Sequence, residues 1–144
     1  MELVIKEFKE LSTQELYEIL QARVSVFVVE QTCPYQELDG KDQSALHLYY
    51  RQGEEILAYL RLLQKTPEEA AVGRVLTIKR GKGLGKSLME AAISLAKTRF
   101  AAKGIYIEAQ TYARGFYEQW GFVQCSDEFL EDGIPHIKMR LKLS

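Results

Sequence analysis

Cysteine, proline and histidine are scarce in this sequence. Its 144 residues include two cysteines, three prolines and two histidines. Cys33 and Cys125 lie far apart and form no C-x-x-C pair, which argues against a disulfide scaffold and against a zinc cluster. We therefore expect no metal, two structural cysteines and a reducing, cytoplasmic environment.

Long apolar runs and an excess of charge of one sign are also missing. No stretch approaches the roughly 20 apolar residues that cross a bilayer. The N-terminal segment MELVIKEFKELS carries a charge every few positions, unlike a signal peptide. The net charge of −1 gives no electrostatic reason to expect nucleic acid or a membrane surface as a partner. With 47% apolar residues, the sequence predicts one globular domain over residues 1–144.

Hydrophobic spacing predicts alternating strands and helices. Ser12 and Glu15 form a capping box, after which apolar residues continue at helical spacing to Phe27. The polar segment 30–43 that follows predicts a loop. The other expected helices are 84–101 and 111–120, and the expected strands are 3–7, 45–50, 56–64, 71–78, 105–110, 122–130 and 136–143.

The order of these elements predicts the fold class. Strand 71–78, the helix after it and strand 105–110 form a crossover unit, which should be parallel and right-handed. The remaining connections favour antiparallel pairing. We expect an α/β (α+β) fold with a mixed, mostly antiparallel central sheet of about seven strands, flanked by helices.

The segment RGKGLGKS, residues 80–87, joins a predicted strand to a predicted helix. A P-loop would need glycine where Arg80 stands, and a Rossmann loop would need glycine where Lys86 stands. The pattern R-x-x-G-x-G fits, with Arg80, Gly83 and Gly85. Glycines let backbone approach a diphosphate, and the amides at the start of a helix attract it. The alternative is a glycine-rich turn with surface lysines.

A second motif follows the next predicted strand. Residues 113–122 read ARGFYEQWGF. Both motifs, in this order, resemble those of the GNAT acetyltransferases, and residues 23–48 and 131–139 are similar to the ElaA-type subgroup of that family. The resemblance spans nearly the whole chain. It implies the GNAT fold, acetyl-CoA as co-substrate, and transfer of the acetyl group to an amine by direct attack in a ternary complex.

The resemblance also implies which residues bind acetyl-CoA. A backbone amide at Leu76 or Thr77 would hold the oxyanion of the thioester. The segment LTIK between Val75 and Arg80 is shorter than in the family, so the choice among the neighbouring amides stays open. The diphosphate would lie on Arg80, Gly81, Lys82, Gly83, Leu84, Gly85 and Lys86.

Three residues are candidates for proton transfer. Tyr117 matches the family's position for the general acid that protonates the departing sulfur, although packing in the core is its alternative role. Glu30 and His136 are candidates for the general base, with Glu108 as a third. For His136, as for His47, a hydrogen bond to backbone is the competing interpretation.

The acceptor pocket should come from the first helix and the loop after it. By family analogy its candidates are Arg23, Phe27, Glu30, Gln31 and Tyr35. The carboxylates around Glu37, Asp39 and Asp42 would either attract a cationic amine or form a solvated loop. The acceptor itself stays open between a small molecule and a peptide amine, and the protein between a monomer and a homodimer.

A GNAT fold does not by itself require catalysis. The alternative to an acetyl-CoA-dependent N-acyltransferase is a non-catalytic module that binds acyl-CoA as a sensor or regulator. Tyr117 and the complete R-x-x-G-x-G pattern favour the enzyme.

Overall fold

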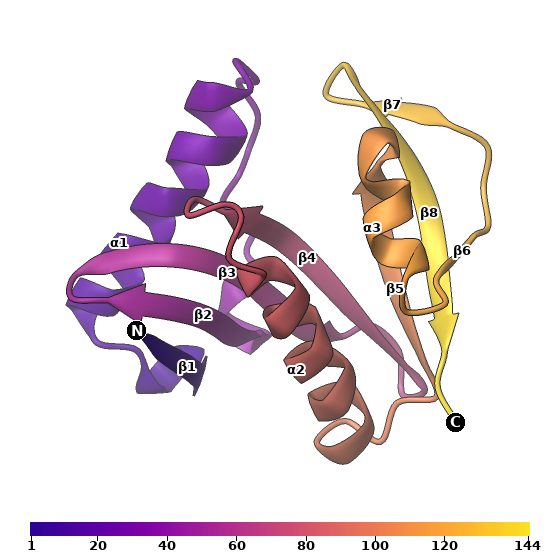
Figure 1. Cartoon of the computed structure of the whole chain (residues 1–144), viewed down its shortest axis with the longest axis horizontal. Helices are drawn as coiled ribbons and strands as arrows, with labels where there is room; N and C mark the ends of the chain where they lie inside the picture. The colour runs from indigo at the N-terminus through magenta and orange to yellow at the C-terminus, as the bar shows by residue number, and fades with distance from the viewer.

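One mixed sheet of eight strands organises the chain (Figure 1). The computed structural model describes residues 1–144. The strand order is β1-β2-β3-β4-β5-β8-β6, and β7 pairs with β8. The strands are β1 (Glu2–Glu7), β2 (Leu46–Gln52), β3 (Glu55–Gln64), β4 (Glu69–Thr77), β5 (Gly104–Gln110), β6 (Val123–Gln124), β7 (Phe129–Glu131) and β8 (Ile134–Lys142). Only the β4–β5 pair is parallel, which confirms the predicted crossover and the predicted fold class.

The helices flank this sheet. They are α1 (Thr13–Val24), α2 (Leu84–Thr98) and α3 (Arg114–Glu118), with 3-10 turns η1 (Phe8–Glu10), η3 (Asp42–Ser44) and η4 (Thr111–Ala113) and a π-helical segment η2 (Ser25–Glu30). None of them is both long and apolar enough to cross a membrane. The strand expected over 122–130 is divided into β6 and β7, with Cys125 bonding to Lys138 of β8 between them.

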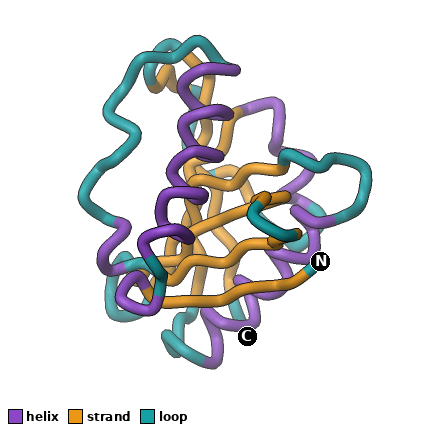
Figure 2. Tube along the Cα trace, turned by 90° about the vertical axis from the view of Figure 1, so that its left-hand side faces the viewer, coloured by secondary structure: helices purple, strands orange, loops and turns teal.

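The first helix begins where its capping box predicts. Ser12 Oγ accepts a hydrogen bond from the Glu15 amide at 3.0 Å, and Glu15 Oε1 accepts one from the Ser12 amide at 2.8 Å. The helix then continues from α1 into η2 in front of the strands (Figure 2). π-Helical segments are rare and are frequent at functional sites.

Two apolar cores lie on opposite faces of the sheet. The larger has 22 buried residues and packs α2 and Tyr117 of α3 against the sheet. The smaller has seven and includes Ile19 and Ala22 of α1, with Tyr49 and Tyr59 from β2 and β3. On this face α1 packs over β3, with Leu76 of β4 in the same core.

The sheet divides at its only parallel pair. β4 and β5 are paired from Glu69 to Ala71 and from Gly104 to Tyr106, and no further. Beyond these residues the two strands diverge (Figure 1). The edge of β4 that faces β5 therefore has no strand partner along the rest of its length, and its backbone groups on that side are available to a ligand.

Candidate active site

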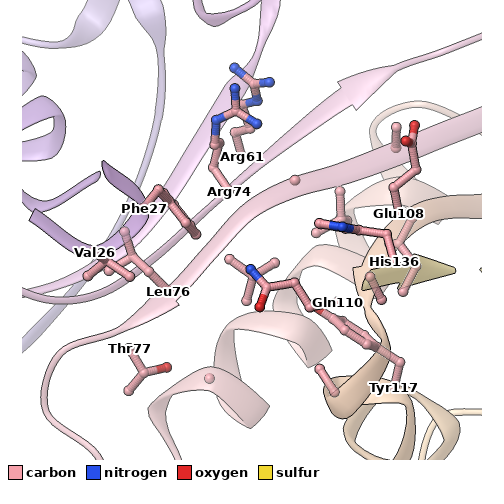
Figure 3. Close-up of a pocket in the computed structure, with 18 of the residues that line it drawn as sticks. Val26, Phe27, Arg61, Arg74, Leu76, Thr77, Glu108, Gln110, Tyr117 and His136 are labelled. Atoms are coloured by element: carbon pink, nitrogen blue, oxygen red, sulfur yellow. The ribbon is translucent and has the colours of Figure 1, made fainter. Parts of the chain in front are cut away.

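A cavity of about 1760 Å³ occupies the space between the diverging strands. β4 and the residues around Thr77 form one wall, and β5, β8 and α3 form the other (Figure 3). The glycine-rich segment, η2 and the loop after η2 also line the cavity. The volume exceeds the roughly 300–1,000 Å³ of ordinary small-molecule pockets, so two substrates can be accommodated together.

The glycine-rich segment leads directly into α2. Gly83 is the residue before the helix and has φ +69°, in the left-handed region that glycine adopts without strain. The amides of the first turn of α2 have no partners within the helix and face the cavity end. Gly81, Leu84, Gly85 and Lys86 line the cavity as well, whereas Lys82 is exposed outside it.

Arg80 and Glu30, predicted for different substrates, contact each other. Arg80 Nη2 lies 3.3 Å from Glu30 Oε1, and both side chains are mostly exposed at the cavity rim. An exposed ion pair of this kind contributes about 0–1 kcal/mol. A diphosphate could therefore replace Glu30 as the partner of Arg80 with only a small loss of free energy.

Gly85 lets β4 approach the start of α2. A Cβ at this position would lie 3.1 Å from Thr77 Oγ1 and 3.7 Å from the Phe116 ring. Thr77 is thus held beside the glycine-rich segment, on the side of the strand that faces α2. The Ile78 amide donates to the Leu57 carbonyl of β3 at 2.8 Å. Since alternate amides of an extended strand point the same way, this favours Thr77 over Leu76 as an amide directed at the cavity.

Tyr117 lies across the cavity from Leu76 and Thr77 (Figure 3). Its ring is 8% exposed and packs edge-on against Phe116 and Phe122 at centroid distances of 5.1 and 5.9 Å. Its hydroxyl makes no hydrogen bond within the chain, unlike that of Tyr50, which bonds to a serine. Burial raises the pKa of Tyr117 well above its ordinary value, so the hydroxyl keeps its proton at neutral pH.

His136 reaches the cavity from β8. Its Nδ1 lies 2.7 Å from the Ile134 carbonyl oxygen, and only a protonated nitrogen can donate to a carbonyl. The neutral ring therefore carries its lone pair on Nε2, which lies 3.6 Å from Glu131 Oε2. The ring stacks on Phe129. The predicted backbone bond is present, and the second nitrogen lies beside the Glu131 carboxylate.

His47 is a structural residue by the same criterion. Its Nε2 lies 3.0 Å from the Asp42 carbonyl and its Nδ1 lies 2.7 Å from the Tyr59 hydroxyl, so both nitrogens are engaged. The ring is fully buried, and burial lowers its pKa. It lies outside the cavity.

Most of the predicted acceptor residues line the cavity. Phe27, Glu30, Gln31 and Tyr35 do so, and Gln31 bridges the two walls through a 3.3 Å bond from Gln110 Nε2. The prediction for Arg23 is wrong. Its side chain is fully buried behind the cavity wall, where its guanidinium is taken up by carboxylates and cannot reach a substrate.

Both interpretations of the acidic loop are also wrong. Glu37 and Asp42 are buried, and Asp39 is half-buried. Desolvation alone would raise the pKa of Asp42, but hydrogen bonds from Arg23 and Arg61 hold it below its ordinary value. These carboxylates are neither solvated nor free to attract an amine, because arginines neutralise them.

Several cavity residues could not be found from sequence. Arg61, Arg74 and Gln110 line it, together with Cys33, whose sulfur lies 3.5 Å from the Asp132 carbonyl across the cavity. None of them stands in a recognisable pattern. Glu108, by contrast, is on β5 and exposed to the cavity, as its candidate role requires.

Comparison with known proteins agrees with this geometry. The family described as acetyltransferase (GNAT) domain matches residues 8–143. A UPF0039 protein of Schizosaccharomyces pombe is 41% identical over 147 aligned positions, covering 99% of this chain and 98% of that protein. Among solved structures, an acyl-CoA N-acyltransferase of Pseudomonas aeruginosa is 40% identical with a TM-score of 0.90. Escherichia coli ElaA is 36% identical with a TM-score of 0.91, and each comparison covers 97% of this chain and 99% of the other. The chain belongs to the GNAT acetyltransferase family, among its ElaA-like members.

Proposed function

We propose that this protein transfers an acetyl group from acetyl-CoA to an amine acceptor within a ternary complex. The observation that carries the proposal is a single cavity that joins the glycine-rich start of α2 to the free hydroxyl of Tyr117. The diphosphate of CoA would lie on the amides of Gly81 to Lys86. The pantetheine arm would follow the unpaired edge of β4, in the manner of an added strand.

The acetyl thioester would then lie between β4 and α3. A backbone amide of β4, at Thr77 or Leu76, would donate to the carbonyl oxygen and stabilise the negative charge that develops on it. The acceptor would enter from the other end of the cavity, between Phe27, Tyr35 and His136. Its nitrogen must lose a proton before it can attack.

The proposed steps conserve atoms and electrons. His136 Nε2 takes a proton from the ammonium group of the acceptor, and the nitrogen lone pair forms a bond to the thioester carbon. The tetrahedral intermediate collapses with cleavage of the carbon–sulfur bond, and Tyr117 gives its proton to the sulfur. The newly bonded nitrogen loses its second proton through solvent to the Tyr117 phenolate, and His136 releases the first proton to solvent. The products are the acetylated amine, CoA as the free thiol and one proton.

Thiol release tests the proposal. The protein is incubated with acetyl-CoA and single amines, drawn from diamines, amino acids and short peptides, and both free thiol and acetylated product are measured. We expect at least one amine to give equal amounts of the two. Saturable binding of acetyl-CoA without product from any amine would instead support the sensor function. Faster turnover with a longer acyl-CoA than with acetyl-CoA would show that the longer acyl-CoA is the preferred donor.

A further inference from the structure

A cluster of buried and half-buried charged side chains adjoins the acceptor end of the cavity, and three of its members line it. We define the ion cluster as three arginines from α1, β3 and β4 and three carboxylates from the loop before β2, namely Arg23, Arg61, Arg74, Glu37, Asp39 and Asp42. Arg23 contacts Glu37 at 2.8 Å and Asp42 at 2.7 Å. The cluster is neutral as a set, and its members lie on four separate segments of the chain. Its role is therefore to join segments and not to bind an ion.

Arg74 is the member of the ion cluster that belongs to β4, the strand whose amide is proposed to bind the thioester oxygen. Arg61 pairs with Gly73, and Tyr59 pairs with Leu76, so β4 has one more residue than β3 over this interval. The extra residue forms a β-bulge, and Arg74 within it has φ +53°. The left-handed conformation costs a residue other than glycine about 1–2 kcal/mol, so the surrounding structure must hold it.

The loop carboxylates hold the bulge. Arg74 Nε donates to the Glu37 carboxylate, and its Nη2 donates to the Glu37 carbonyl at 2.8 Å and to Asp39 at 3.4 Å. Figure 3 shows the guanidinium groups of Arg61 and Arg74 side by side above the strand. Arg23 binds the other side of Glu37, which fixes that carboxylate between α1 and β4.

The bulge reverses the order in which side chains of β4 alternate between the two faces of the sheet. Before it, Val72 points into the larger core against α2. After it, Val75 packs against that core while Leu76 joins the smaller core under α1. Without the extra residue this alternation would be inverted, and Thr77 would turn away from Gly85. The bulge thus determines which residues of β4 face α2 beyond Arg74, Thr77 among them.

The same loop also forms a wall of the acceptor end. Tyr35 and Asp39 line the cavity, and the Arg74 guanidinium lies 5.6 Å from the centre of the Tyr35 ring. We propose that Arg74 and Glu37 are positioning residues that couple the acceptor wall to the oxyanion-binding strand. This inference rests on the proposed function and adds a specific role for the ion cluster.

Substitution of Arg74 tests the coupling. Arg74→Gln removes the charge and the fork of donors, and Arg74→Lys keeps the charge without the fork. We expect Arg74→Gln to lower kcat/KM for the acceptor by about 10-fold or more, since small displacements at the reacting centre are costly. Arg74→Lys should fall between this variant and wild type. The stabilisation that CoA confers should be the same in all three proteins.

Arg51→Gln is the matched control. Its side chain is 24% exposed against 20% for Arg74, it contacts Glu18 at 3.1 Å, and it lies outside the cavity. Arg51→Gln should lower the stability of the fold about as much as Arg74→Gln does, and it should leave kcat/KM for the acceptor unchanged. Equal kcat/KM for Arg74→Gln and Arg51→Gln would overturn the coupling.

Hydrogen–deuterium exchange separates this inference from the proposed function. We expect peptides covering residues 35–42 and 74–77 to exchange faster together in Arg74→Gln, and at the wild-type rate in Arg51→Gln. If wild type releases no thiol with any amine, the proposed function fails and the exchange data alone decide the coupling. Unchanged exchange of either peptide in Arg74→Gln would refute it.

Discussion

At the scale of single residues, the proposed reaction depends most on the hydroxyl of Tyr117. The residue is buried, its hydroxyl makes no hydrogen bond within the chain, and the raised pKa keeps that hydroxyl protonated at neutral pH. A group in this state can donate to a developing thiolate without first breaking a hydrogen bond. Tyr117→Phe removes only the oxygen and leaves the aromatic packing with Phe116 and Phe122 in place.

We expect Tyr117→Phe to lower kcat by about 10-fold or more with little change in CoA affinity, because the lost interaction belongs to the transition state. A thioester analogue with a more acidic thiol should be less affected. Tyr49→Phe is the control, since that hydroxyl is also buried but bonds to Glu15 outside the cavity. Steady-state kinetics on the three proteins make the comparison, and equal kcat for all three would remove Tyr117 from the mechanism.

His136 is the base of the proposed reaction. A base must be deprotonated to act, so His136→Gln should lower turnover and remove the decline on the acid side of the pH–rate profile. Glu30 is the alternative base, and its carboxylate lies 3.3 Å from Arg80 Nη2 at the cavity rim. Rates that match wild type from about pH 6 to 9 would leave His136 with a structural role only.

The sequence identified some of the residues discussed here and not others. Tyr117 and Gly83 stand inside compact motifs, so their neighbours in the chain identify them. Arg74 and Glu37 stand 37 positions apart and meet only because a bulge and a loop fold together. Arg23 was predicted as a substrate residue by family analogy, and nothing local in the sequence shows that carboxylates bury it.

At the scale of elements, the proposed function assigns the diphosphate of the co-substrate to the glycine-rich segment. CoA at 100 times its dissociation constant should stabilise the folded protein by about 2.7 kcal/mol. Gly83→Val should abolish this shift, because a side chain there obstructs the approach of the diphosphate to the helix start. Thermal unfolding with and without CoA measures the shift.

Gly53→Val provides the control for backbone strain. Gly53 has φ +61° against +69° for Gly83, and a Cβ at either position meets nothing within 4 Å. Both variants should lose similar stability without ligand, about 1–2 kcal/mol. Only Gly53→Val should retain the stabilisation by CoA. A full shift in Gly83→Val would show that the diphosphate binds elsewhere.

Elements with strong periodicity were predictable, and interruptions of them were not. The capping box at Ser12 and the three-stranded meander β2–β4 follow from local patterns. The π-helical segment after Val24, the division of 122–130 and the bulge at Arg74 depend on tertiary contacts. Two of these three features line the cavity.

At the scale of the whole molecule, buried carboxylates make stability depend on acidity. Burial would raise the pKa of Glu15, but bonds from Lys6, Ser12 and Tyr49 lower it from 4.5 to about 2. Arg23 and Arg61 likewise lower that of Asp42. A depressed pKa in the folded state gives stability that is complete above the ordinary value and lost as the pH falls toward the folded value.

The free energy of unfolding should therefore decline as the pH falls from 4.5 toward 2. Asp42→Asn should be less stable than wild type at neutral pH, because it leaves Arg23 with one fewer carboxylate, and should show a shallower decline in acid. Urea unfolding at a series of pH values tests both. Parallel pH curves for the two proteins would mean that Asp42 does not contribute to the acid sensitivity.

The fold and family of the molecule were predictable because the two motifs occur in a fixed order on a strand–helix–strand unit. The location of the cavity was only partly predictable from the sequence. Sequence places the glycine-rich segment at one end and Tyr117 on the opposite wall. The separation of β4 from β5 after Ala71, which creates the space between them, comes from pairing that no local pattern records.

A crystal structure with an unreactive acetyl-CoA analogue tests the central claim most directly, because it shows where the co-substrate lies. The diphosphate should contact the amides between Gly81 and Lys86, and the pantetheine should follow the unpaired edge of β4. The acetyl oxygen should face the amide of Thr77 or Leu76, with the sulfur position within hydrogen-bonding reach of the Tyr117 hydroxyl. An analogue bound outside the space between β4 and β5, or with its sulfur directed away from Tyr117, would contradict the account.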